Sequence, residues 1–475
     1  MAIIKDFSKI AGSSFVNFLI GLFSTPLITR MVYPEQYGNW ALFCVYSNVL
    51  STILLLGTDY IIVRYYYKFN DEVYRYRLIS WCFKISILAI VFTSIPMVLS
   101  LKFIRPNWSW IILGLFSLNV FMNVLNRLSN LLLRFENKIN ILSIATILHK
   151  AIFITIALAL LLCVNHHKFE LLSISTVLST GATVIVCLYY IRYLFHPKIV
   201  HDVCLLPKKE MFSYGLPLMF SGCAYILFQT TDKLVISNYC SETDLGIYTS
   251  AASFLSLFAI LQSAFTTVWW PYVMKNYEKS PENKTLYIKA NDIVCYVLVI
   301  IGLTFILFKD LIILFLGENF RGAIVVLPFI VFQPILYTLS ETVVVGLNFQ
   351  KKSKAQLFIT ISSLVFNIII NVILTKAMGI IGTSIAVGLS YIFFLILRTA
   401  VSYYYYKVQY HFIRMFLSVV ILFSYAFINT LFPNHYFTYI FVVIFYLLLS
   451  LMYKDVIKEL LIKILELKDK KKLAH

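Results

Sequence analysis

Long apolar stretches separated by short polar connections recur along the whole chain. A helix that spans a membrane needs about 20 mostly apolar residues. The pattern therefore predicts an all-α polytopic membrane protein with about 14 transmembrane helices. A shorter amphipathic segment at 309–320 is expected to lie at the membrane interface. The expected spans are 10–30, 39–58, 78–100, 109–131, 141–164, 170–191, 212–236, 245–269, 290–308, 323–345, 356–375, 380–402, 413–432 and 436–453.

The composition argues against soluble classes of protein. Of the 475 residues, 60% are hydrophobic and 13% are charged, whereas a soluble domain carries about 25% charged residues. A soluble enzyme, a nucleic-acid-binding protein and a disordered chain are therefore disfavoured. The eight cysteines include no CxxC pair, so we expect no metal site and no cofactor. The predicted connections are short, and the functional residues should lie among the helices.

The basic residues predict the orientation of these helices. Lys and Arg total 40 against 22 Asp and Glu. With the N-terminus in the cytoplasm, 30 basic residues fall in cytoplasmic segments and 7 in outer ones. Cytoplasmic loops of membrane proteins are enriched in Lys and Arg. An even number of spans, with both termini cytoplasmic, is therefore predicted, and the excess charge does not require a nucleic-acid partner.

Two short matches indicate an internal repeat. PEQYGNW at 34–40 matches ETDLGIY at 242–248 with an offset of 208, which pairs Gly38 with Gly246. RFENK at 134–138 matches NFQKK at 348–352 with an offset of 214. Six helices per half give both halves the same orientation, as in transporters whose two bundles rock about a shared site. The expected division is a six-helix bundle at 1–206, a second at 207–408, and two additional helices with a basic cytoplasmic tail at 409–475.

Several motifs follow one another in a fixed order. They are YPEQYG (33–38), GTDYIIVRYY (57–66), YGLPLMF (214–220), Asp232-Lys233, LGIYTSAASF (245–254), Trp270-Pro271 and GIIGTS (379–384). Together they resemble the polysaccharide-export signature of the O-antigen and oligosaccharide flippases. That superfamily also contains multidrug antiporters and the peptidoglycan lipid flippase. The resemblance covers roughly residues 5–405.

The resemblance implies a function and a fold. The function is a flippase that moves undecaprenyl-diphosphate-linked oligosaccharide from the inner to the outer leaflet of the bacterial cytoplasmic membrane, an O-antigen or related repeat unit of lipopolysaccharide biosynthesis. The fold is two six-helix bundles in a V-shaped arrangement like that of the multidrug antiporters. Such proteins are secondary transporters, not enzymes. They are driven by a coupling ion, proton or sodium, and work beside polysaccharide polymerase machinery.

Two other functions stay open. A multidrug antiporter of the same fold would carry organic cations, and its cavity would be dominated by carboxylates. A membrane polysaccharide polymerase or glycosyltransferase would need a sizeable loop domain, which the short outer connections do not offer. The chain also has no Gly-rich loop ending in GK[ST] for ATP.

Charged residues inside predicted spans are costly and tend to face a cavity or a partner. Lys150 is expected to bind the anionic diphosphate, or else to pair with a carboxylate on another helix. Its neighbour His149 is either proton-linked or simply packed. Asp232 and Glu341 are candidates for ion coupling or gating. Lys233 is a candidate substrate contact, with snorkelling to the interface as the alternative.

The remaining candidates lie in the first half. Arg30, Arg64 and Arg127 are expected to guide the substrate headgroup, although Arg30 and Arg64 could be interface anchors. Asp59 either pairs locally with Arg64 or forms a cytoplasmic gate. Three amides form one stripe that could bind sugar hydroxyls or bond neighbouring helices; they are Asn119, Asn123 and Asn126.

Overall fold

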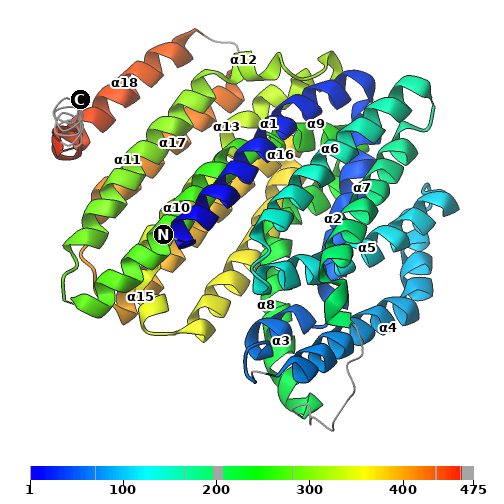
Figure 1. Cartoon of the computed structure of the whole chain (residues 1–475). Helices are drawn as coiled ribbons and strands as arrows, with labels where there is room; N and C mark the ends of the chain where they lie inside the picture. The colour runs from blue at the N-terminus through cyan, green and yellow to red at the C-terminus, as the bar shows by residue number, and fades with distance from the viewer. Residues whose placement is uncertain are drawn as a thin grey trace, which may run out of the picture. The chain divides into compact units, whose positions relative to one another are not determined.

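The computed structural model describes residues 2–69, 71–164, 166–195, 207–280, 282–433, 436–459 and 462. Every regular element within these ranges is a helix (Figure 1). The prediction of an all-α membrane protein is therefore confirmed. The internal contacts of the chain divide it into two compact units, Met1–Ser253 and Phe254–His475.

The first unit contains the helices up to α9. α7 packs against both α5 and α6, α6 packs against α1, and α2 packs against α5, α8 and α9. The bounds are α1 (Ala2–Met31), α2 (Pro34–Leu54), α3 (Thr58–Tyr65), α4 (Glu72–Ile104), α5 (Trp110–Phe135), α6 (Ile139–Cys163), α7 (Lys168–Ile191), η1 (Arg192–Phe195), α8 (Lys208–Tyr239) and α9 (Glu242–Ala252).

The second unit contains the remaining helices. α14 packs against α11 and α16, and α17 packs against α11 and α18. The bounds are α10 (Leu255–Lys279), α11 (Thr285–Leu307), α12 (Lys309–Ile313), η2 (Glu318–Val325), α13 (Leu327–Ile330), α14 (Phe332–Val343), α15 (Val345–Phe349), α16 (Ser353–Tyr405), α17 (Phe412–Leu431) and α18 (Phe437–Met452). The bundle boundaries predicted at 206 and 408 stay a prediction. The part of the predicted basic tail beyond residue 462 lies outside the described residues.

The helices agree with the predicted number of spans. Within the described residues, 9 helices are long and apolar enough to cross a membrane, or 11 if each of two bent pairs counts as one span. α16 is broken at Gly379, where φ is 59° and ψ is −139°, so its 53 residues provide two spans. The shorter apolar helices Phe15–Met31 and Phe437–Met452 bring the total to the predicted fourteen.

The two glycines paired by the repeat lie against each other where α2 and α9 begin. A Cβ atom on Gly38 would lie 2.1 Å from the carbonyl oxygen of Glu242. A Cβ atom on Gly246 would lie 1.9 Å from the carbonyl oxygen of Pro34. The two helices therefore touch backbone to backbone, an approach that only glycine permits at these positions.

The second match of the repeat also has a structural counterpart. Asn137 and Lys351, 214 residues apart, both adopt left-handed backbone angles, with φ of 55° and 52°. In each turn the next amide N–H donates to the carbonyl five residues before it, over 2.9 Å. The same turn thus joins α5 to α6 and α15 to α16, which supports the repeat.

Candidate functional site

A polar cavity of about 660 Å³ lies inside the first unit, between α2, α3, α5 and α8. Five of its fifteen lining residues carry amide side chains, and the others include two arginines and one carboxylate. The polar lining residues are Asn48, Ser51, Thr52, Asp59, Asn123, Asn126, Arg127, Asn130, Arg134, Gln229 and Thr230. A water-filled cavity is where a membrane protein can keep such groups within the bilayer.

The sequence of α5 explains much of this wall. Asn123, Asn126 and Asn130 are spaced i, i+3 and i+7, so they lie on one face of the helix. The Nδ2 of Asn130 donates to Oδ1 of Asn126 over 3.0 Å. Asn123 and Asn126 both line the cavity, as the predicted stripe of amides on this helix suggested. Asn119 is 2% exposed and does not contribute to the lining.

An ion pair joins α3 to α5 at the cavity. The Nη2 atom of Arg127 lies 2.8 Å from Oδ2 of Asp59, and Nη1 donates to the hydroxyl of Thr52 over 3.3 Å. The Arg127 side chain is 39% exposed and that of Asp59 is 10% exposed. One face of the guanidinium can thus meet a ligand. Asp59 pairs with Arg127 on another helix and not with Arg64, which lies over the ring of Tyr214 at 5.9 Å.

Lys150 and His149 lie elsewhere in the first unit. The Nζ of Lys150 donates to the backbone carbonyl of Asn17 on α1 over 2.9 Å. The Nε2 of His149 lies 3.3 Å from the hydroxyl of Thr180 on α7. Neither residue lines the polar cavity. Lys150 forms no ion pair among the described residues. Its partner is therefore a backbone carbonyl and not the carboxylate that the alternative prediction required.

Three further candidates lie on α1 and α8. Arg30 is exposed near the end of α1, and Lys233 is half-buried on α8. Asp232 is 7% exposed, and its Oδ2 accepts a hydrogen bond of 2.6 Å from the Tyr248 hydroxyl on α9. Its other oxygen, Oδ1, has no hydrogen-bond partner among the described residues. Asp232 and Tyr248 both belong to the motifs that suggested the family.

Glu341 forms a separate buried cluster in the second unit. Its Oε1 lies 2.7 Å from Nη1 of Arg398 on α16, and its Oε2 accepts from the indole of Trp270 over 3.0 Å. The indole of Trp269 donates to the Glu341 backbone carbonyl over 3.1 Å. One carboxylate thus connects α10, α14 and α16.

Sequence reasoning missed several of these residues. Arg398 was not among the predicted site residues; its side chain on α16 is 15% exposed and pairs with Glu341 on α14. Asn130 continues the α5 stripe by one more step and was detectable from spacing. No spacing pattern in α2 or α8 marks Asn48 or Gln229 as lining the cavity.

Known proteins resemble this chain in sequence and in fold. A family described as polysaccharide biosynthesis protein matches residues 3–277. A curated relative, the probable low-salt glycan biosynthesis flippase Agl15 of Haloferax volcanii, is 25% identical over 188 residues. That match covers 38% of this chain and 39% of the relative, so it spans about two fifths of the relative's length.

Solved structures show the same architecture. A structure of the lipid II flippase MurJ in an inward closed conformation has a TM-score of 0.67 and 16% identity, covering 94% of this chain and 99% of that one. An inward-facing multidrug resistance transporter of the MATE family, from the MOP superfamily, has a TM-score of 0.56 and 16% identity, covering 84% and 96%. The fold of this chain is therefore that of the flippase MurJ and of the MATE transporter, and because the family match spans more than half of its length, the chain belongs to the polysaccharide biosynthesis protein family.

Proposed function

We propose that this protein flips an undecaprenyl-diphosphate-linked oligosaccharide, an O-antigen or related repeat unit, from the inner to the outer leaflet of a bacterial cytoplasmic membrane. Both termini would be cytoplasmic, and the product would pass to polysaccharide polymerase machinery. The main support is the amide-rich cavity of about 660 Å³ that carries Arg127 and Arg134.

The chemistry of the cavity suits the two polar parts of this substrate. Amide side chains donate and accept hydrogen bonds at once, which matches sugar hydroxyls. Guanidinium groups bind phosphate oxygens through two parallel N–H donors. The diphosphate would meet the exposed face of Arg127, and the glycan would lie along Asn123, Asn126 and Asn130. The polyprenyl chain needs no protein site because it can stay in lipid.

Ion coupling is part of the proposal, with proton or sodium as the ion. Asp232 is the strongest candidate carrier, because one of its carboxylate oxygens lacks a partner among the described residues. Asp59 is a candidate gate, since substrate at Arg127 would compete for the same guanidinium. Glu341 and His149 remain further candidates, and Lys150, Arg30, Arg64 and Lys233 remain candidate headgroup contacts outside the cavity.

The test is flipping of a labelled lipid-diphosphate glycan by the full chain in liposomes. We expect Arg127→Gln to slow flipping by about 10- to 100-fold, since a charged hydrogen bond contributes about 1.5–3 kcal/mol. Arg321→Gln is the matched control, because that arginine is 53% exposed and pairs locally with Glu318. Flipping by Arg127→Gln at the wild-type rate would show that the substrate binds elsewhere, and Lys150→Ala in parallel tests the other cation.

Two further measurements separate the rival functions. The same liposomes are loaded with a fluorescent organic cation, whose export would favour the multidrug antiporter. Flipping is then compared with and without an imposed proton or sodium gradient. We expect a gradient to speed flipping by the wild type and not by Asp232→Asn. An identical response of the two proteins would exclude Asp232 as the carrier.

A further inference from the structure

The cavity between α2, α3, α5 and α8 has an apolar part as well as a polar one. Tyr60 and Val63 line it from α3, and their spacing of three residues places them on one face of that helix. Tyr60 is half-buried, and Val63 is 51% exposed. Among the fifteen described residues that line this cavity, Tyr60 is the one aromatic residue. The short helix α3 thus contributes a flat apolar group, whereas α5 contributes amides.

A glycine on α8 makes room for the Tyr60 ring. A Cβ atom on Gly222 would lie 2.7 Å from the Tyr60 hydroxyl oxygen and 3.7 Å from Cζ of the same ring. Real Cβ contacts essentially never fall below 3.0 Å, so the hydroxyl end of the ring occupies space that a side chain at this position would fill. Glycine within a helix is less favourable than alanine by about 1 kcal/mol, and this close approach gives it a purpose.

Tyr60 also lies beside the group that is proposed to bind phosphate. It follows Asp59 in the chain, and Oδ2 of Asp59 lies 2.8 Å from Nη2 of Arg127. The Arg127 guanidinium is in turn a neighbour of the Tyr60 hydroxyl. A sugar on the Tyr60 ring is therefore close to a diphosphate on Arg127. The sugar that can make both contacts is the one bonded directly to the diphosphate.

A pyranose ring suits a site of this mixed character. Where its hydroxyls are equatorial they project from the rim of the ring, and its two faces carry C–H groups. The face of an aromatic ring is negatively polarised and attracts such hydrogens. The hydroxyls at the rim can at the same time bond to the amides of Asn123 and Asn126, which line the same cavity.

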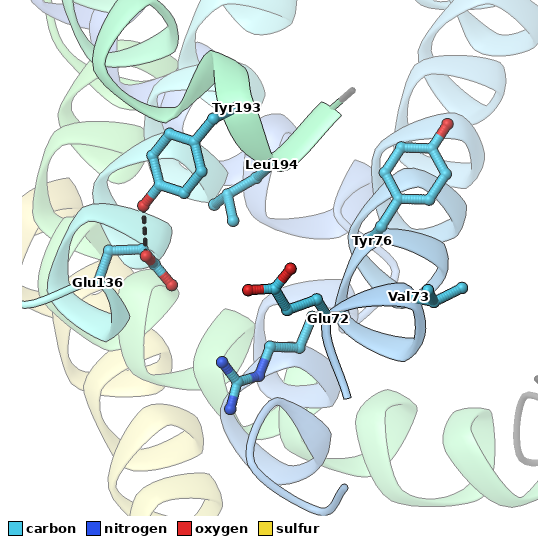
Figure 2. A pocket seen from close by; sticks show the side chains of 7 residues that line it. Glu72, Val73, Tyr76, Glu136, Tyr193 and Leu194 are labelled. Atoms are coloured by element: carbon cyan, nitrogen blue, oxygen red, sulfur yellow. Dashed lines mark hydrogen bonds between the residues drawn. The ribbon is translucent and has the colours of Figure 1, made fainter. Parts of the chain in front are cut away.

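A second cavity in the first unit, of about 330 Å³, is less suited to the same headgroup. It is lined by the carboxylates of Glu72 and Glu136 (Figure 2), and these would repel a diphosphate. Arg75 also lines it, but its guanidinium is stacked over the ring of Tyr66 at 5.3 Å. The hydroxyl of Tyr193 points to Glu136 and donates to it. The first cavity is therefore the better place for a sugar joined to a diphosphate.

We propose that Tyr60 is a specificity-determining residue for the transported lipid. Its ring stacks on the first sugar of the repeat unit, a hexopyranose with equatorial hydroxyls, while Arg127 holds the diphosphate. Gly222 keeps open the space that the ring needs. This inference rests on the proposed function and adds to it the class of sugar that is bonded to the diphosphate.

The test is native mass spectrometry of the purified full-length protein with two lipids, undecaprenyl diphosphate that carries a single glucose and undecaprenyl diphosphate without sugar. We expect the wild type to retain more of the glucosyl lipid. Tyr60→Leu should lower the ratio of glucosyl to bare lipid by about three- to tenfold, because it removes the aromatic face. Tyr60→Phe keeps that face and should preserve the ratio. Arg127→Gln should weaken retention of both lipids alike, since both carry the diphosphate.

A second set of variants tests the placement of the ring. Gly222→Ala forces the Tyr60 hydroxyl to move and should lower the ratio as well. Combining Gly222→Ala with Tyr60→Phe should restore it, because the hydroxyl is gone and Cζ would lie 3.7 Å from the new Cβ, an ordinary contact. Tyr436→Leu is the matched control, at a tyrosine of the second unit that is 87% exposed, and it should leave the ratio unchanged.

The outcomes separate this inference from the proposed function. A wild type that retains neither lipid would overturn both. Equal retention of the two lipids by the wild type, or a Tyr60→Leu ratio equal to that of the wild type, would overturn the role of Tyr60 alone. So would a double variant whose ratio stays as low as that of Gly222→Ala, because the ring would then not be placed by this glycine.

Discussion

Replacing Gly38 by alanine tests the close contact between α2 and α9. The added Cβ would lie 2.1 Å from the carbonyl oxygen of Glu242 and 2.9 Å from the amide nitrogen of Gly246. Because real Cβ contacts essentially never fall below 3.0 Å, the two helices would have to separate by about 1 Å. The backbone atoms on both sides offer no flexible side chain that could move away instead.

The cost follows from the packing around this contact. Tyr37 and Ala41 on α2 are each 4% exposed, and Leu245 on α9 is fully buried. Separating the helices loosens these contacts, and overpacking of this kind costs about 1–3 kcal/mol. For a unit of this size each kcal/mol lowers the melting temperature by about 2–4 °C. We therefore expect Gly38→Ala to melt about 3–10 °C below the wild type.

Melting is measured with a thiol-reactive dye, since Cys82, Cys187 and Cys223 in the first unit are buried free cysteines. Gly114→Ala in α5 is the matched control, because a Cβ there meets nothing within 4 Å. Alanine is the better helix former by about 1 kcal/mol, so this control should melt at or above the wild-type temperature. Gly38→Ala melting as high as Gly114→Ala would refute the backbone contact.

Three other experiments, with four substitutions, test the charged and capping groups. A double-mutant cycle with Arg127→Gln and Asp59→Asn should give a coupling free energy of about 1 kcal/mol. This value is modest because the Arg127 side chain is partly exposed. Additive melting shifts of the two substitutions would contradict the ion pair. Glu341→Gln should destabilise the second unit by about 3 kcal/mol, since it leaves the Arg398 guanidinium buried without a carboxylate; an unchanged melting transition would contradict this. Asp71→Ala removes the side chain that caps α4 by accepting from the amide of Val73 over 2.9 Å, and calorimetry should show a loss of about 1 kcal/mol.

The spans could be predicted because they depend on local composition, whereas the bends of 52° between α2 and α3 and of 60° between η2 and the helix that follows it were not predicted. A segment in lipid must be apolar and internally hydrogen-bonded over its whole length, and that requirement is visible in the sequence. The break at Gly379 falls in the GIIGTS segment, where the sequence placed a boundary between spans. The repeat was detectable because one match pairs the glycines at which α2 and α9 touch, and the other lies at two turns with left-handed backbone angles.

The partners of the charged side chains could not be predicted in the same way. Spacing along a helix shows which residues share a face, but not which helix lies opposite. Asp59 and Arg127 are 68 residues apart, and nothing local connects them. Lys150 has the expected position within a span, yet its contact is a backbone carbonyl on α1, a group that carries no mark in the sequence.

The Glu341 cluster has a consequence for movement within the second unit. Parting α10, α14 or α16 would expose a carboxylate and a guanidinium to hydrocarbon, at a cost of several kcal/mol for each ion. In the proposed transport cycle we therefore expect these three helices to move together as one block. Bending has to occur at points such as the Gly379 break in α16, where the backbone already departs from helical angles.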